Sequence, residues 1–104
     1  MKNSTGLTAT FEVQKDNRSL VNGVLHFSTV TALLRAGTAA IGGGHATVID
    51  LSGVSDSDSS GLALLIEWLS IAKAESRSLK YENIPVQLHQ LARLSEVEEL
   101  LTAG

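Results

Sequence analysis

The residues best placed to do chemistry in this chain are Asp58, Ser59 and Ser60. They end a stretch rich in Asp and Ser that follows a short apolar run, and a strongly apolar segment begins directly after them. This order predicts a buried strand, a polar loop and then a helix over residues 60–76. The three side chains would lie at a helix N-terminus, where unpaired backbone N–H groups and the positive end of the dipole favour hydroxyls and anions. Such a site can cap the helix, accept a phosphate or receive a partner protein.

Two roles are open to the hydroxyl groups. Ser59 or Ser60 is expected to cap the helix, which stabilises a helix by about 1 kcal/mol relative to Ala. Ser59 could also be a regulatory or docking point. A phosphoryl group on Ser59 would add about −1.5 to −2 charges. Repulsion from the neighbouring Asp56 and Asp58 would then make it a signal that disrupts a docked partner.

Two apolar stripes run along the helix predicted over residues 60–76. The stripe expected to hold the helix on a sheet consists of Leu62, Leu65, Ile66 and Leu69. The second stripe consists of Leu64, Trp68 and Ile71. An exposed Trp68 with two aliphatic neighbours would be an anchor for a partner protein, whereas a buried Trp68 would pack against the last helix.

The elements that must position these residues alternate along the chain. Strands are predicted over residues 11–14, 19–27, 45–51 and 78–83, and Gly23 is expected to mark a bulge. Helices are predicted from Ser28 or Thr29 to Ala40, over 60–76, over 86–94 with Pro85 in the first turn, and within 96–102. This order indicates an α/β fold, a mixed sheet of four to five strands with helices mainly on one face. We expect one domain over residues 1–104, with a loose lead-in over residues 1–9.

Composition excludes several classes of function. The chain has 104 residues, of which 43% are hydrophobic and 18% charged, so it can bury the core of one domain. The net charge of −3 without a basic cluster argues against nucleic-acid binding. The absence of cysteine excludes disulfides and thiolate chemistry. Leu62–Ile66, the longest apolar run, is far below the ~20 residues of a membrane span, so a cytoplasmic protein is expected.

Neither a metal site nor catalysis is expected. His26, His45 and His89 lack the spacing of a dedicated metal site. The glycines at 42–44 follow a helix instead of a strand and precede no Lys-Ser/Thr pair, so they form a connector and not a phosphate loop. The Gly-x-Ser-x-Gly elbow of serine hydrolases is absent. We therefore predict no catalytic residue, no metal and no cofactor.

The segment Val54–Leu62 resembles the signature of STAS domains, the fold of anti-sigma-factor antagonists. In that family an Asp-Ser-(Ser/Thr)-Gly-Leu motif opens the second helix and its first Ser is the phosphoacceptor. The resemblance implies that Asp58 is the motif Asp, Ser59 the acceptor position, Ser60 the variable position and Gly61 a close-packing glycine. It extends over residues 11–101.

Within this family three segments look most like one branch, the small STAS subunit of a bacterial ABC transporter that maintains lipid asymmetry. They are Gly61–Leu65, Leu69–Ala74 and Leu91–Val97. This resemblance implies a non-catalytic cytoplasmic subunit that binds the transporter's ATPase, in a complex with a membrane permease, and that reaches the inner membrane only through these partners. The expected contact residues are Asp58, Ser59, Ser60, Leu64, Trp68 and Ile71.

The four residues 58–61 are themselves closer to the phosphorylated antagonists than to this transporter branch. An anti-sigma-factor antagonist switched by phosphorylation of Ser59 is therefore the alternative.

Overall fold

The computed structural model describes residues 8–102 and contains, within them, four strands and four helices. In chain order they are β1 (Ala9–Val13), β2 (Arg18–Leu25), α1 (Val30–Gly42), β3 (Val48–Ser57), α2 (Ser59–Ala74), β4 (Lys80–Glu82), α3 (Val86–Leu94) and α4 (Glu98–Thr102). Most of the lead-in predicted over residues 1–9 lies outside the described residues, and Ala9 already belongs to β1.

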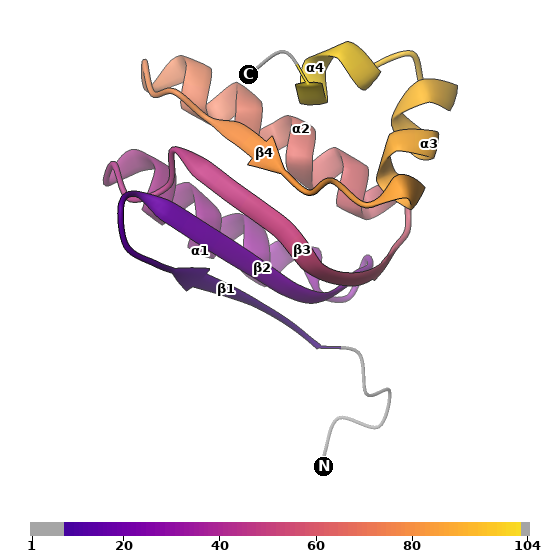
Figure 1. Cartoon of the computed structure of the whole chain (residues 1–104), viewed down its shortest axis with the longest axis horizontal. Helices are drawn as coiled ribbons and strands as arrows, with labels where there is room; N and C mark the ends of the chain where they lie inside the picture. The colour runs from indigo at the N-terminus through magenta and orange to yellow at the C-terminus, as the bar shows by residue number, and fades with distance from the viewer. Residues whose placement is uncertain (1–7, 103–104) are drawn as a thin grey trace.

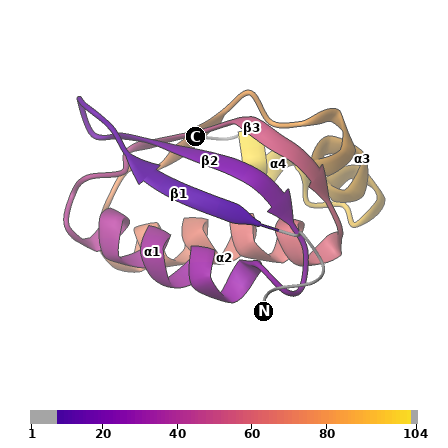
Figure 2. The ribbon, with the colours of Figure 1, turned by 90° about the horizontal axis from the view of Figure 1, so that it is seen from below.

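The strands form one mixed sheet in the order β1-β2-β3-β4 (Figure 1). β1 is antiparallel to β2, whereas β3 is parallel to both β2 and β4. The parallel connections pass through α1 and α2, and since such crossovers are nearly always right-handed, both helices lie on the same face of the sheet (Figure 2). α3 and α4 follow β4 and pack against α2 and the β3–β4 side of the sheet. The predicted α/β fold, with helices mainly on one face, is confirmed.

Gly23 marks the predicted bulge in β2. Its φ of 101° lies in the region that favours glycine, and the ladder to β3 shifts between Gly23 and Val24. A Cβ atom here would lie 2.2 Å from the carbonyl oxygen of Thr8. The position therefore requires glycine both for its backbone angle and for the close approach of the chain before β1.

The strand β3 is longer than the sequence predicts. The expected strand ended at Leu51 and was followed by a loop, but β3 continues to Ser57. Backbone pairing with β2 extends to the match between Leu25 and Ser57. The strand persists because its backbone groups complete the ladder, whatever the polarity of its side chains. The polar connection to α2 is reduced to Asp58.

Trp68 belongs to the core, which rules out the exposed anchor, one of the two alternatives that the sequence left open, and removes Trp68 from the expected contact residues. Its side chain is completely buried. The ring packs edge-to-face on Phe11 of β1, with 5.6 Å between centroids, and its Nε1–H donates to the carbonyl of Leu34 in α1 at 3.4 Å. Gly37 of α1 provides the space that the ring occupies. The sequence suggested the last helix as the partner of a buried Trp68; the ring lies instead against α1 and β1.

α3 and α1 begin where the sequence predicts. α3 spans residues 86–94 as predicted, although Pro85 lies at the N-cap position and not in the first turn. Thr29 occupies the N-cap position of α1, but its side chain does not cap the helix. Its hydroxyl accepts from the N–H of His26 at 3.0 Å and donates to the carbonyl of Val24 at 2.6 Å. Thr29 therefore closes the turn between β2 and α1.

Candidate functional site

Asp58 organises the N-terminus of α2. Its Oδ1 accepts from the backbone N–H of Ser60 at 2.8 Å, and its Oδ2 accepts from the backbone N–H of Phe27 at 3.3 Å. The expectation that Ser59 or Ser60 caps the helix is therefore wrong. Asp58 is extended and directly precedes the first helical residue, so its carboxylate reaches the second N–H of the helix. One side chain thus caps α2 and ties it to the turn that follows β2.

The site is acidic. Partial burial acts to raise the pKa of Asp58, but the hydrogen bonds from the backbone N–H groups of Ser60 and Phe27 outweigh it and lower the pKa. The pKa of Asp56 is lowered by hydrogen bonds from His26 and then Gln87. His26 Nε2 lies 2.9 Å from Asp56 Oδ2. Both carboxylates are therefore ionised at neutral pH.

The start of α2 rests closely on the ends of β2 and β3, and Gly61 makes this possible. A Cβ atom at Gly61 would lie 2.1 Å from Ser57 Oγ and 2.9 Å from Leu25 Cβ. Ser57 is buried, and its N–H donates to the Gln87 side-chain oxygen from α3 at 3.1 Å. Gly61 thus has the close-packing role that the sequence motif implies. Gln87, which links α3 to this junction, was not predicted because nothing near it in the chain marks it.

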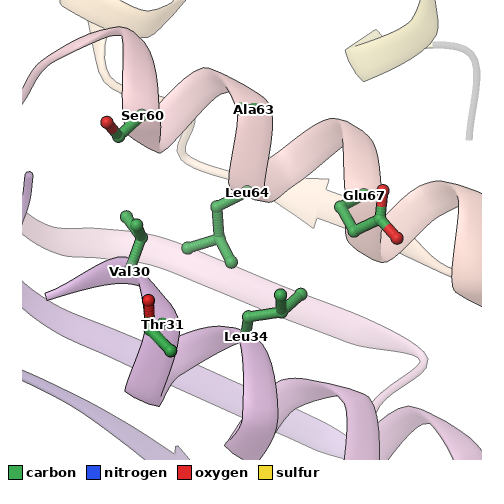
Figure 3. Close-up of a pocket in the computed structure, with 7 residues that line it drawn as sticks. All are labelled: Val30, Thr31, Leu34, Ser60, Ala63, Leu64 and Glu67. Atoms are coloured by element: carbon green, nitrogen blue, oxygen red, sulfur yellow. The ribbon is translucent and has the colours of Figure 1, made fainter. Parts of the chain in front are cut away.

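A groove between α1 and α2 opens beside the capped helix end (Figure 3). It has a volume of about 380 Å³ and is lined by Val30, Thr31, Leu34, Ser60, Ala63, Leu64 and Glu67. The first three come from α1 and the other four from α2, and Leu64 points across toward α1. Along α2 the groove runs from Ser60 to Glu67. The polar start of this helix therefore adjoins the apolar groove.

The structure brings together only part of the predicted contact surface. Asp58, Ser59 and Ser60 lie at the start of α2, Ser59 exposed, and Leu64 lines the adjoining groove. Trp68 is in the core. Ile71 is half-buried, does not line the groove, and follows Leu64 by about 10 Å along the helix.

The sequence did not identify the residues that α1 contributes to this surface. Val30 and Leu34 line the groove, yet their spacing is that of any helix packed on a sheet. Phe27 was assigned to the preceding strand, but it lies in a turn and its side chain is 82% exposed. The signal that could have found it is the large apolar residue placed among turn-forming residues.

Across residues 8–102, none of the helices is long and apolar enough to cross a membrane. Over the same residues, no three His, Asp or Glu side chains are grouped to hold a metal ion.

The chain matches one protein-family model and is similar in fold to several solved structures. A family model described as "Mlab, STAS domain" matches residues 13–102. No curated protein sequence matches the chain significantly.

Solved structures of similar fold include the following three. The anti-sigma factor antagonist SpoIIAA in its unphosphorylated form has a TM-score of 0.63 at 19% identity, covering 83% of this chain and 82% of its own. The Bacillus cell fate determinant SpoIIAA in its phosphorylated form has a TM-score of 0.65 at 19% identity, covering 86% and 84%. Mglu has a TM-score of 0.56 at 23% identity, covering 72% of this chain but 19% of its own. At these identities the likeness shows the fold alone.

Proposed function

Since the chain belongs to the STAS domain family, matched over residues 13–102, we propose that it is a non-catalytic STAS subunit of a phospholipid ABC transporter. It binds the transporter's cytoplasmic ATPase and supports its activity, in a complex with a membrane permease that maintains outer-membrane lipid asymmetry. The description "Mlab" of the matching family supports this branch. The chain reaches the inner membrane only through these partners.

The observation that carries the proposal is the pairing of an acidic, hydroxyl-bearing helix end with an apolar groove. Asp58 holds the helix start rigidly, and the groove continues directly from Ser60. Protein interfaces commonly combine an apolar centre with polar groups that fix orientation. Both backbone hydrogen bonds to Asp58 are structural, which suits a docking surface better than a reacting group.

Size also supports docking of a protein side chain. The groove volume of about 380 Å³ lies at the small end of ligand pockets, roughly 300–1,000 Å³. Leu64 forms its floor and Ala63 an exposed part of its wall. A leucine or similar side chain of the ATPase that fills it would contribute about 1.5–3 kcal/mol by burial.

The first test enlarges a side chain at the helix start. Ser59→Glu should weaken binding to the purified ATPase at least tenfold, because a side chain three heavy atoms larger at the centre of the contact would crowd the docked partner. The fold should persist, since an acidic residue in the first turn of a helix is favourable by about 0.3–1 kcal/mol. Ser78→Glu, the same change at an exposed position beyond the other end of α2, is the control and should change the Kd less than twofold. Unchanged affinity of the Ser59 variant, measured by titration calorimetry, removes the site assignment.

The second test blocks the groove. Ala63→Glu places a long charged side chain at an exposed wall position without removing any core atom. We expect at least a tenfold higher Kd for the ATPase. Ala36→Glu, at an exposed position of α1 that does not line the groove, is the matched control. Equal affinities of the two variants would contradict a role for the groove.

A second candidate function is a partner-switching antagonist controlled by phosphorylation of Ser59. Ser59 is exposed, is the first residue of α2, and follows the carboxylate of Asp58. SpoIIAA, an anti-sigma factor antagonist of similar fold, has been solved in a phosphorylated form. This function requires the mass increment of one phosphoryl group on the peptide containing Ser59, isolated from native cells. Its absence across many growth conditions would count against the antagonist.

A further inference from the structure

Phe27 is an exposed aromatic residue in a turn whose backbone is held by hydrogen bonds. It is 82% exposed and lies in the turn between β2 and α1. Its backbone N–H is bound by Asp58, and Thr29 closes the same turn through hydrogen bonds to the backbone of His26 and Val24. The backbone under the ring is therefore fixed before any partner arrives, which lowers the entropy lost on binding.

The position of Phe27 separates it from the other exposed apolar residues. Single exposed apolar side chains are ordinary, and Leu94 on α3 is equally exposed at 82%. Phe27 differs because Asp58 binds both its backbone and the start of α2, and because Val30, three residues later, lines the groove. Phe27 thus lies where the capped end of α2 meets the turn that leads into α1 and its groove residue Val30.

The charge around Phe27 and the groove specifies the chemistry of a partner. The acidic side chains here are Asp56 and Asp58, which lie just before α2, and Glu67 on the groove. Asp56 also pairs with His26 at 2.9 Å. Arg35 lies on α1 outside the residues that line the groove. A complementary surface would therefore present a basic side chain here.

We propose that Phe27 anchors the ATPase by inserting into an apolar pocket of that subunit whose rim carries a Lys or Arg facing Asp56 and Asp58. This inference rests on the function proposed above and adds the residue that contributes most to affinity. Aromatic side chains dominate binding energy in this way when they fill a pocket and exclude water.

The test measures binding of full-length variants to the purified ATPase. Phe27→Ala should raise the Kd at least 30-fold, whereas Leu94→Ala, which removes an equally exposed side chain from α3, should change it less than twofold. Both variants should keep the unfolding midpoint of the parent chain, because neither side chain is buried. Asp56→Asn should raise the Kd about three- to tenfold and reduce its dependence on salt, since it removes one charge opposite the basic rim.

The outcomes separate this proposal from the one on which it rests. If Ala63→Glu weakens binding but Phe27→Ala stays within twofold of the parent, the anchor is overturned and the proposed function stands. If the parent chain does not bind the ATPase at all, both are overturned. If the chain self-associates and Phe27→Ala abolishes this, Phe27 binds a second copy of the chain and not the ATPase. That result would also overturn the anchor. A salt-independent Kd would contradict the basic rim.

Discussion

Replacing Gly37 by Ala should destabilise the fold, although the same change in most helices is stabilising. Gly37 lies buried within α1, against the ring of Trp68. A Cβ atom added there would lie 2.3 Å from Trp68 Cε2 and 2.4 Å from Cζ2. Ordinary contacts of Cβ atoms begin at 3.4 Å, so α1 or the ring must move by about 1 Å.

The size of the effect follows from two opposing terms. The ring cannot move easily, because it is completely buried, packs on Phe11 and donates its N–H to Leu34. Overpacking of a core costs roughly 1–3 kcal/mol, and a displacement of this size in a rigid site belongs at the upper end. The higher helix propensity of Ala stabilises the fold by about 1 kcal/mol relative to Gly. The free energy of unfolding should therefore fall by about 2 kcal/mol.

Urea unfolding followed by Trp68 fluorescence measures this directly, since Trp68 is the chain's single tryptophan. Gly42→Ala is the matched control in the same helix, because nothing lies within 4 Å of a Cβ atom there. It should leave the stability unchanged or raise it by up to about 1 kcal/mol. Equal unfolding free energies for the two variants would refute the packing of Trp68 against α1.

Two further predictions concern single side chains. Asp58→Ala should lower the free energy of unfolding by about 1 kcal/mol at pH 7 through loss of the cap. The folded-state pKa of Asp58 is lowered, so the stability that Asp58 adds over Ala is complete above the unfolded pKa of about 4 and is lost as the pH falls through the folded pKa. Denaturant titrations of both proteins at pH 7 and pH 3 measure this. A difference in unfolding free energy that did not shrink at pH 3 would contradict the prediction. Tyr81→Phe should lower the free energy of unfolding by about 1 kcal/mol, because the buried hydroxyl of Tyr81 donates to the carbonyl of Leu65 at 2.6 Å. An unchanged Tm in calorimetric melting would argue against this bond.

Much of the fold was predictable because periodic apolar residues report which face of an element is buried. α3 was predicted residue for residue, since Pro85 marks its start and the pattern after it is helical. The length of β3 was not predictable in the same way. Its second half is polar, and it is a strand because β2 supplies hydrogen-bond partners as far as Ser57. That pairing is a property of the assembled sheet and is invisible in the segment itself.

The site was predicted at its centre and missed at its edges. Asp58, Ser59 and Ser60 were placed at a helix start by local sequence. Which of them caps the helix depends on where β3 ends, and its extension to Ser57 leaves Asp58 as the N-cap residue. Trp68 lies on a helix that is apolar on several sides, so periodicity could not say which side α1 covers. Pairing of α1 with α2 decides both that burial and the groove.

The proposed role as an ATPase-binding subunit is tested most directly by affinity purification of the tagged chain from its native cells in detergent, with identification of its partners by mass spectrometry. The proposal predicts recovery of an ABC ATPase together with a membrane permease, and loss of both with Ser59→Glu but not with Ser78→Glu. Recovery of a small histidine-kinase-like protein without any transporter subunit would contradict the proposal and would favour the antagonist switched at Ser59.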